Sequence, residues 1–166
     1  IYKNKFNLII QKQINHLINE IEKSKFVDDK MVGCAAIILT GLSLNEKEKY
    51  LNFGLSILKK IINFSFDNQS FPKSRSIRQL IFYLKYFILI REWLKESQSE
   101  IPEYLDEIIF YLGKSYSILC QEKNNTILFN GNHEINNKDF DNYLNNHGYK
   151  FKNNSFETGG YIFLKN

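Results

Sequence analysis

Cysteine and proline are scarce in this chain, which has two of each among its 166 residues. Cys34 and Cys120 both lie in apolar stretches, so we expect two buried free thiols in preference to a disulfide or a reactive site. Long apolar runs are also absent, because charged residues interrupt the densest one, Leu80–Leu94. Roughly 18 consecutive apolar residues are needed to cross a bilayer, and we therefore predict no membrane span.

Runs of like charge are missing as well. The chain has 22 Lys and Arg and 18 Asp and Glu residues, and its net charge of +4 is spread along the sequence. A nucleic-acid-binding tail gathers five or six like charges, so no nucleic-acid partner is predicted. A helical nucleic-acid-binding module stays a third alternative, against which the dispersed charge argues. The first residues lack the pattern of a signal peptide.

The chain does contain enough apolar residues, 43% of the total, to bury a core. Apolar residues at steps of three and four predict five helices, with N-caps expected at Asp28, Asn45 and Ser76 and a start at Pro102 for the fifth. The apolar stripes expected to be buried span residues 6–21, 32–42, 51–62, 80–88 and 105–119. The links between them are mostly short, which predicts antiparallel helical hairpins.

The sequence changes in character after Glu122. Residues 126–129 (Thr-Ile-Leu-Phe) predict a short strand, Asn130 and Gly131 a turn, and residues 137–146 a short helix. Residues 160–164 (Gly-Tyr-Ile-Phe-Leu) predict a terminal strand without a partner, so we expect both ends of the chain to be cut. We predict a helical domain over residues 1–122, then a linker and the start of a β-sandwich over residues 123–166.

No phosphate-binding loop, zinc spacing, nucleophile elbow or dinucleotide fingerprint occurs in the sequence. His16 lies beside the first apolar stripe, whereas His133 and His147 lie in Asn-rich segments. Solvated histidines and catalytic ones both fit these positions. Two histidines without a fixed spacing to a third ligand predict no metal site, and we expect no cofactor.

A basic cluster and four tyrosines remain as candidates for binding. Lys73, Arg75 and Arg78 surround the start of the fourth helix and could hold a carboxylate or sulfate, or simply form a solvated helix start. The tyrosines have helical spacing, so they are either core residues or platforms that stack on sugar rings. They are Tyr83, Tyr86, Tyr111 and Tyr116.

Several segments, taken in order, resemble bacterial heparinase II/III-like proteins. They are GCAAIILTGLSL, FDNQSFPKSRS, REWLKESQSEIPEYLDEII, TILFNG and GGYIFL. The resemblance implies a mainly α fold, in which α/α hairpins form an incomplete toroid, followed by a β-sandwich half that lies outside the chain. It also implies lyase chemistry, in which acidic, uronate-containing glycans are cleaved by β-elimination. A periplasmic or cell-envelope location would follow, although the residues alone leave the cytoplasm open.

The resemblance also suggests site residues. Arg75 would contact a carboxylate or sulfate, Asp67 and Asn130 would shape the cleft, and Tyr83 or Tyr161 at its rim would stack on sugar. Catalytic residues stay unidentified, because this chain departs from the lyase pattern at four positions. Asp28 and Asp29 replace an Asn-His pair, Phe71 replaces a His, and Gln79 replaces a Tyr. A non-catalytic glycan-binding or scaffold protein is therefore the alternative.

Overall fold

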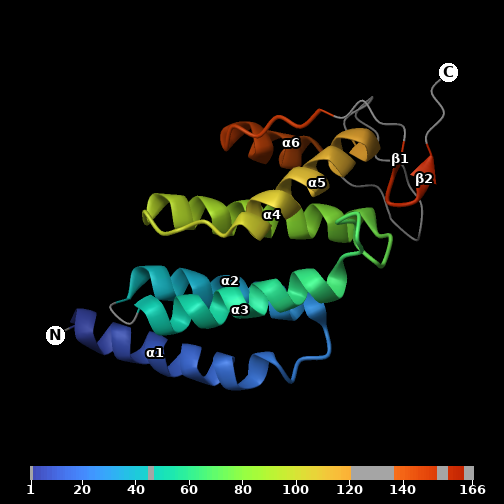
Figure 1. Ribbon diagram of the computed structural model, residues 1–166. Coiled ribbons are helices and arrows are strands. Elements are labelled where there is room, and N and C mark those ends of the chain that lie inside the picture. Colours follow the sequence, from blue (N-terminus) through green and yellow to red (C-terminus); the bar gives the residue numbers. More distant parts are fainter. Residues whose placement is uncertain (1, 45–46, 121–136, 153–156, 163–166) are drawn as a thin grey trace. The chain divides into compact units, whose positions relative to one another are not determined.

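The computed structural model describes residues 2–44, 47–120, 137–152 and 157–162 (Figure 1). Within these ranges the chain is mainly helical, as predicted, with one two-stranded antiparallel sheet. The elements are α1 (Tyr2–Ile21), α2 (Val27–Ser43), α3 (Lys47–Ser65), α4 (Ile77–Glu96), α5 (Glu103–Cys120), α6 (Asn137–Asn146), β1 (Glu157–Thr158) and β2 (Tyr161–Ile162). No helix in the described ranges is both long and apolar enough to span a membrane.

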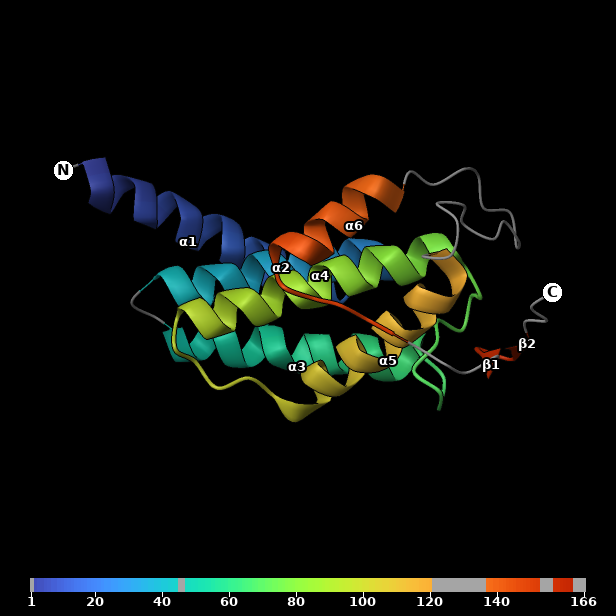
Figure 2. The same cartoon turned by 90° about the horizontal axis from the view of Figure 1, so that it is seen from above.

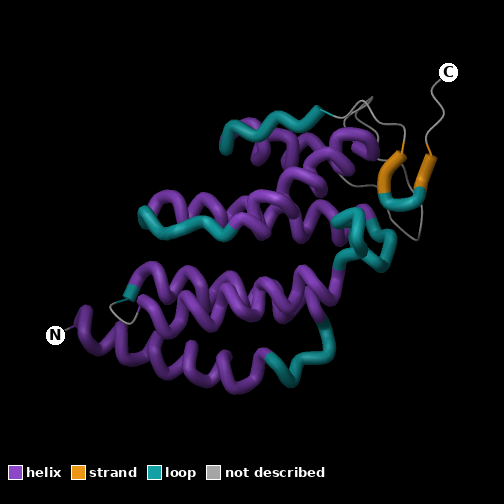
Figure 3. The backbone as a smooth tube through the Cα atoms, in the orientation of Figure 1, coloured by secondary structure: helices purple, strands orange, loops and turns teal. Residues whose placement is uncertain are grey.

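The chain forms two compact units. Unit 1 comprises residues 1–64 and 89–100, and unit 2 comprises residues 65–88 and 101–166. The loop between α3 and α4, drawn in teal in Figure 3, belongs to unit 2. The predicted boundary near residue 122, the strand at residues 126–129 and the turn at Asn130 all lie outside the described residues.

Helices α1, α2 and α3 of unit 1 pack through glycines on α2 and α3. A Cβ atom added at Gly33 would lie 3.0 Å from Ile21 of α1, and one at Gly41 would lie 2.6 Å from the backbone nitrogen of Leu51 on α3. A Cβ at Gly54 would meet Ile38. Contacts between α2 and α3 thus pair late residues of one with early residues of the other, which is the predicted antiparallel arrangement.

The predicted N-cap of α2 is wrong, and of its predicted buried stripe (Val32, Ala35, Ala36, Leu39 and Leu42) only Ala35 is buried. Val32 and Leu39 are 46% and 41% exposed, whereas Cys34, Ile37 and Ile38 are fully buried. Apolar residues surround most of this helix, so their spacing alone does not fix which arc faces the core. Phe26 occupies the N-cap position with an extended backbone and no capping hydrogen bond from its side chain, and Asp28 lies within the first turn. The Asp28 carboxylate there still interacts favourably with the positive end of the helix dipole.

The Cys34 thiol is buried and donates a hydrogen bond of 3.1 Å to the Gly54 carbonyl. Burial raises the pKa of this thiol to about 12. The predicted buried free thiol is therefore confirmed for Cys34. The side chain of Cys120 lies outside the described parts of the chain.

We expect Cys34 to resist thiol reagents while the protein is folded, because only the thiolate reacts. In a Cys120→Ser variant at pH 8, its reaction with a disulfide reagent should be roughly 1,000-fold slower than that of an unperturbed thiol. The same variant in denaturant provides the reference rate. Equal rates in the folded and unfolded protein would contradict the burial of this thiol.

In unit 2, the predicted cap of α4 is present. The Ser76 hydroxyl accepts the Gln79 N–H at 3.4 Å, and the Gln79 side chain accepts the Ser74 hydroxyl. The N-terminal half of α4 contributes Tyr83 to an aromatic cluster with Phe66 and Phe87. Helix α5 contacts α6 through Tyr116, whose hydroxyl donates to Asp141 at 2.7 Å. The predicted bounds of α6 are confirmed.

The terminal strand was predicted to have no partner, and this prediction is wrong. Tyr161 and Ile162 of β2 pair with Thr158 and Glu157 of β1 in an antiparallel hairpin. Gly159 and Gly160 form its turn, and both have positive φ angles. The partner strand is only two residues long and has no alternating apolar pattern, so it was not predicted.

Candidate functional site

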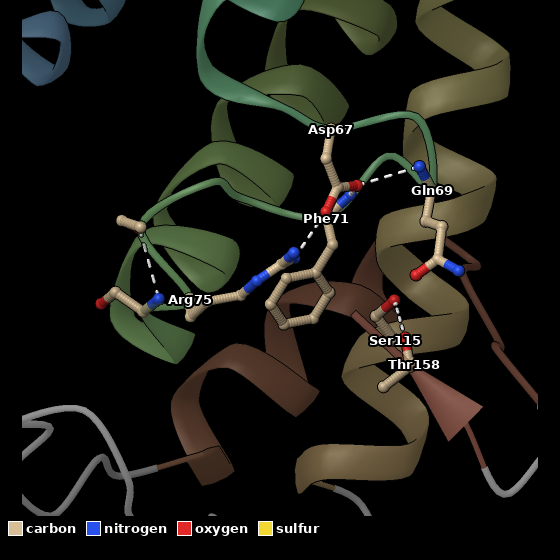
Figure 4. Close-up of polar contacts among 8 residues, drawn as sticks. Asp67, Gln69, Phe71, Arg75, Ser115 and Thr158 are labelled. Carbon is tan, nitrogen blue, oxygen red and sulfur yellow. Dashed lines mark hydrogen bonds and ion pairs between the residues drawn. The ribbon is translucent and has the colours of Figure 1, made fainter. Parts of the chain in front are cut away.

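The loop between α3 and α4 is ordered by one carboxylate. One oxygen of Asp67 accepts the N–H groups of Gln69 and Phe71 at 2.9 and 3.0 Å (Figure 4). The Asp67 N–H donates in turn to the Phe71 carbonyl at 2.9 Å. Such local bonds replace those of regular secondary structure, as aspartate commonly does in turns.

The second oxygen of Asp67 binds Arg75. Its guanidinium donates at 2.5 Å, and its cationic carbon lies 5.5 Å from the centre of the Phe71 ring. Arg75 also has a φ of 57°, a left-handed conformation in which non-glycine residues are uncommon. The structure thus brings two predicted site residues together. Their ion pair stabilises the loop, so Arg75, which was predicted to bind an anion, already donates to Asp67.

The pKa of Asp67 reflects opposing effects. Partial burial raises it, but hydrogen bonds from the Phe71 N–H, the Arg75 guanidinium and the Gln69 N–H outweigh burial and leave the pKa below 3.8. A carboxyl group with a lowered pKa stabilises the fold above its unfolded-state pKa. That contribution is lost as the pH falls through the lower, folded-state value.

We therefore expect Asp67→Asn to destabilise the protein by about 2 kcal/mol at pH 7, since hydrogen bonds to charged groups contribute about 1.5–3 kcal/mol. The difference from the wild type should shrink as the pH falls below 3.8, where wild-type Asp67 also becomes protonated. Urea unfolding between pH 2.5 and 7 measures both effects. Glu100→Gln, at an exposed position, is the control and should show neither.

The loop is held against the β1–β2 hairpin through Phe71. This side chain is fully buried, and its ring lies where a Cβ atom at Gly159 would be. The Tyr161 ring meets it edge to face at 6.4 Å. Beside it, the hydroxyls of Thr158 and Ser115 on α5 share a hydrogen bond of 2.6 Å. Within unit 2 the hairpin therefore contacts the loop on one side and α5 on the other (Figure 4).

These three elements line an open cleft of about 530 Å³. The loop contributes Asn68, Gln69 and Ser70 to its lining, and α5 contributes Tyr111 and Lys114. Glu107 and Glu157 add carboxylates. The Tyr111 side chain is 42% exposed, so part of its ring is open to solvent. Amides, hydroxyls, charges and one accessible aromatic ring therefore converge on a space large enough for a small ligand.

The other predicted site residues are placed differently. The rim position predicted for Tyr83 is wrong, because only 1% of this residue is exposed and Phe66 and Phe87 pack against its ring. Tyr161 is half-buried against Phe71. Asn130 lies outside the described residues. Of the five predicted residues, Asp67, Arg75 and Tyr161 come together around Phe71.

Neither of the two histidines in the described residues lines the cleft, and neither do Phe71 and Gln79. His16 is exposed on α1, and the His147 ring packs against Tyr143 at 4.6 Å. His133 is outside the described ranges. Phe71 is a packing residue, and Gln79 belongs to the helix cap. The described residues also contain no group of three or more His, Cys, Asp or Glu placed to hold a metal ion.

Sequence reasoning named Tyr111 only as one of four tyrosines and missed Glu107 and Lys114. A signal was present, because these three residues follow steps of four and three and therefore share a face of α5. The residues of the loop tip carry no comparable periodic signal. Only folding brings them to that face.

Compared with known proteins, the chain matches no family model, no curated protein and no solved structure. The interpretation of the cleft therefore depends on its own geometry.

Proposed function

We propose that this chain binds an acidic glycan in the cleft between the Asp67–Arg75 loop, α5 and the β1–β2 hairpin. The accessible ring of Tyr111 beside the loop amides is the observation that carries the proposal. Sugar rings stack on aromatic faces through their C–H groups, while their hydroxyls need donors and acceptors at fixed positions. Asn68, Gln69 and Ser70 supply both kinds of group.

Within this proposal Lys114 neutralises the uronate carboxylate. It lies one helical turn from Tyr111 and lines the same cleft. Its ammonium group is 4.1 Å from the centre of the Phe110 ring, a contact that steadies the long side chain. Glu107 and Glu157 accept hydrogen bonds from sugar hydroxyls. Arg75 braces the loop instead of contacting the glycan itself.

We further propose that the chain is the helical half of a heparinase II/III-like lyase, an α/α toroid completed by a C-terminal β-sandwich half. In β-elimination, a base removes the proton beside the carboxylate while the bond to the glycosidic oxygen breaks. A carbon–carbon double bond forms, and the leaving oxygen takes up a proton. Tyr111 is a residue of the type that serves as the base, and Lys114 would stabilise the charge that develops on the carboxylate.

The test uses the full-length protein and a panel of uronate-containing and neutral oligosaccharides. Ultraviolet absorption follows the unsaturated product, and calorimetry measures binding. Tyr111→Phe should lower the rate at least about 100-fold, and Lys114→Gln should weaken binding of acidic glycans about tenfold. Lys150→Gln, at an exposed position in unit 2, is the matched control and should change neither. Equal binding of neutral oligosaccharides would contradict the acidic specificity.

A non-catalytic glycan-binding or scaffold protein is the second candidate, and Phe71 favours it. The resemblance places a histidine there, but this side chain is fully buried and packs against the hairpin turn. Gln79 likewise belongs to a helix cap where the pattern has a tyrosine. Saturable binding that depends on Lys114, with no unsaturated product from any glycan, would establish this candidate and exclude the lyase.

A further inference from the structure

A second hollow lies in unit 1, where α1 ends, α2 begins and the last turns of α3 pass. Its volume is about 450 Å³, within the range of roughly 300–1,000 Å³ that is typical of small-molecule sites. All of its lining residues belong to unit 1, whereas the glycan cleft uses only unit 2. Figure 2 shows helices α1, α2 and α3 of this unit from above.

The floor of this hollow is apolar. Ile21 of α1 and Ile57 and Ile61 of α3 line it, and each is less than 5% exposed. Phe64 forms a more open part of the wall, since 70% of its surface is exposed. An exposed phenylalanine beside a hollow of buried isoleucines offers apolar surface that a ligand can cover.

The rim carries an excess of positive charge. Lys25, Lys30 and Lys60 line the hollow together with a single carboxylate, Glu22. Lys60 donates to the Glu22 carboxylate at 2.7 Å, and Lys30 donates to the Glu22 carbonyl at 3.1 Å. The Glu22 carboxylate therefore balances the charge of only one of the three ammonium groups, that of Lys60. The rim is complementary to a further anion.

We infer that this hollow binds a single-chain amphiphile with a carboxylate head and an alkyl tail, of the fatty-acid class. The tail lies along the isoleucines and Phe64, and the head is held by Lys25 and Lys30. A partner helix is the less favoured occupant, because it needs a groove that accepts apolar side chains over several turns. This hollow is confined to the ends of three helices.

Calorimetric titration of the chain with sodium decanoate tests the inference, and 1-decanol serves as the neutral probe of equal length. We expect one saturable site for decanoate and at least fivefold weaker binding of decanol. A Lys25→Gln/Lys30→Gln variant should weaken decanoate binding at least tenfold and leave decanol binding unchanged. Lys12→Gln, at an exposed position of α1 outside the hollow, is the control and should bind decanoate like the wild type.

Isoleucine methyl NMR spectra identify where decanoate binds, and the signals of Ile57 and Ile61 should shift first. Circular dichroism checks that the double variant is folded. If it is not, the wild-type comparison of decanoate with decanol, together with the methyl shifts, still decides the question. No saturable binding of decanoate, equal binding of decanol, or shifts elsewhere in the chain would each overturn the inference. Binding only to phospholipid vesicles would also overturn it.

Discussion

Gly41→Ala should destabilise the protein by about 3 kcal/mol and lower its Tm by roughly 10 °C. The added Cβ would lie 2.6 Å from the backbone nitrogen of Leu51 and 3.1 Å from its Cα. A backbone neighbour has no rotamer into which it can retreat, so α2 and α3 must separate. Alanine favours a helix over glycine by about 1 kcal/mol, which offsets only part of this cost. Thermal and urea unfolding measure the effect.

Gly33→Ala is the matched control on the same helix. Its Cβ would lie 3.0 and 3.3 Å from the ends of the Ile21 and Leu17 side chains, which can move by a few tenths of an ångström. The gain in helix propensity of about 1 kcal/mol should therefore balance or exceed the crowding. If Gly41→Ala were no more destabilising than Gly33→Ala, the close approach of α2 to Leu51 would be wrong.

Gly159→Ala should release the β1–β2 hairpin from the loop. A Cβ there would overlap the Phe71 ring, which is fully buried, and φ at this position is +57°. Left-handed backbone costs a residue other than glycine about 1–2 kcal/mol, and the overlap adds to that cost. We expect the Phe71 N–H to exchange with solvent about 100-fold faster, equivalent to about 3 kcal/mol of lost local stability.

Gly160→Ala separates the cost of the left-handed backbone from the overlap with the Phe71 ring. Its φ is +77°, but a Cβ atom at this position meets no other atom within 4 Å among the described residues. It should therefore show the backbone cost alone, with roughly tenfold faster exchange. Native-state hydrogen exchange measured by NMR compares the two variants. Equal exchange rates in both would rule out the contact between Gly159 and Phe71.

The helices were predictable because their signals are local. Ser76 and Gln79 mark the start of α4, and a short apolar repeat marks α6 within its observed bounds. The buried arc of α2 was not predictable, since apolar residues lie on most sides of that helix. Which arc becomes core depends on where α1 and α3 approach, and the glycines at 33, 41 and 54 carry that information through close contacts.

The candidate site was only partly predictable, for a related reason. Asp67 and Arg75 are eight residues apart in one loop, so their proximity was within reach of local reasoning. The meeting of that loop with Tyr111 depends on contacts distant in sequence, such as the one between Phe71 and Gly159. Tyr83 was misplaced because its helical spacing fits a core position and an exposed rim equally well.

In the loop between α3 and α4, some residues hold the backbone in shape and others, at the tip, are exposed. Asp67 accepts hydrogen bonds from Arg75 and from the Phe71 N–H, and the Phe71 ring is buried. Asn68 and Gln69, at the tip, are exposed and line the cleft. Side chains at the tip can be exchanged without disturbing the bonds that shape the backbone. Under the proposed function, ligand preference is thus free to change through substitutions at the tip while stability is conserved. A library that varies residues 68 and 69 alone would change the exposed tip and leave the bonds of the loop in place, since Ser70 has a left-handed backbone and its N–H donates to the Asp67 carbonyl.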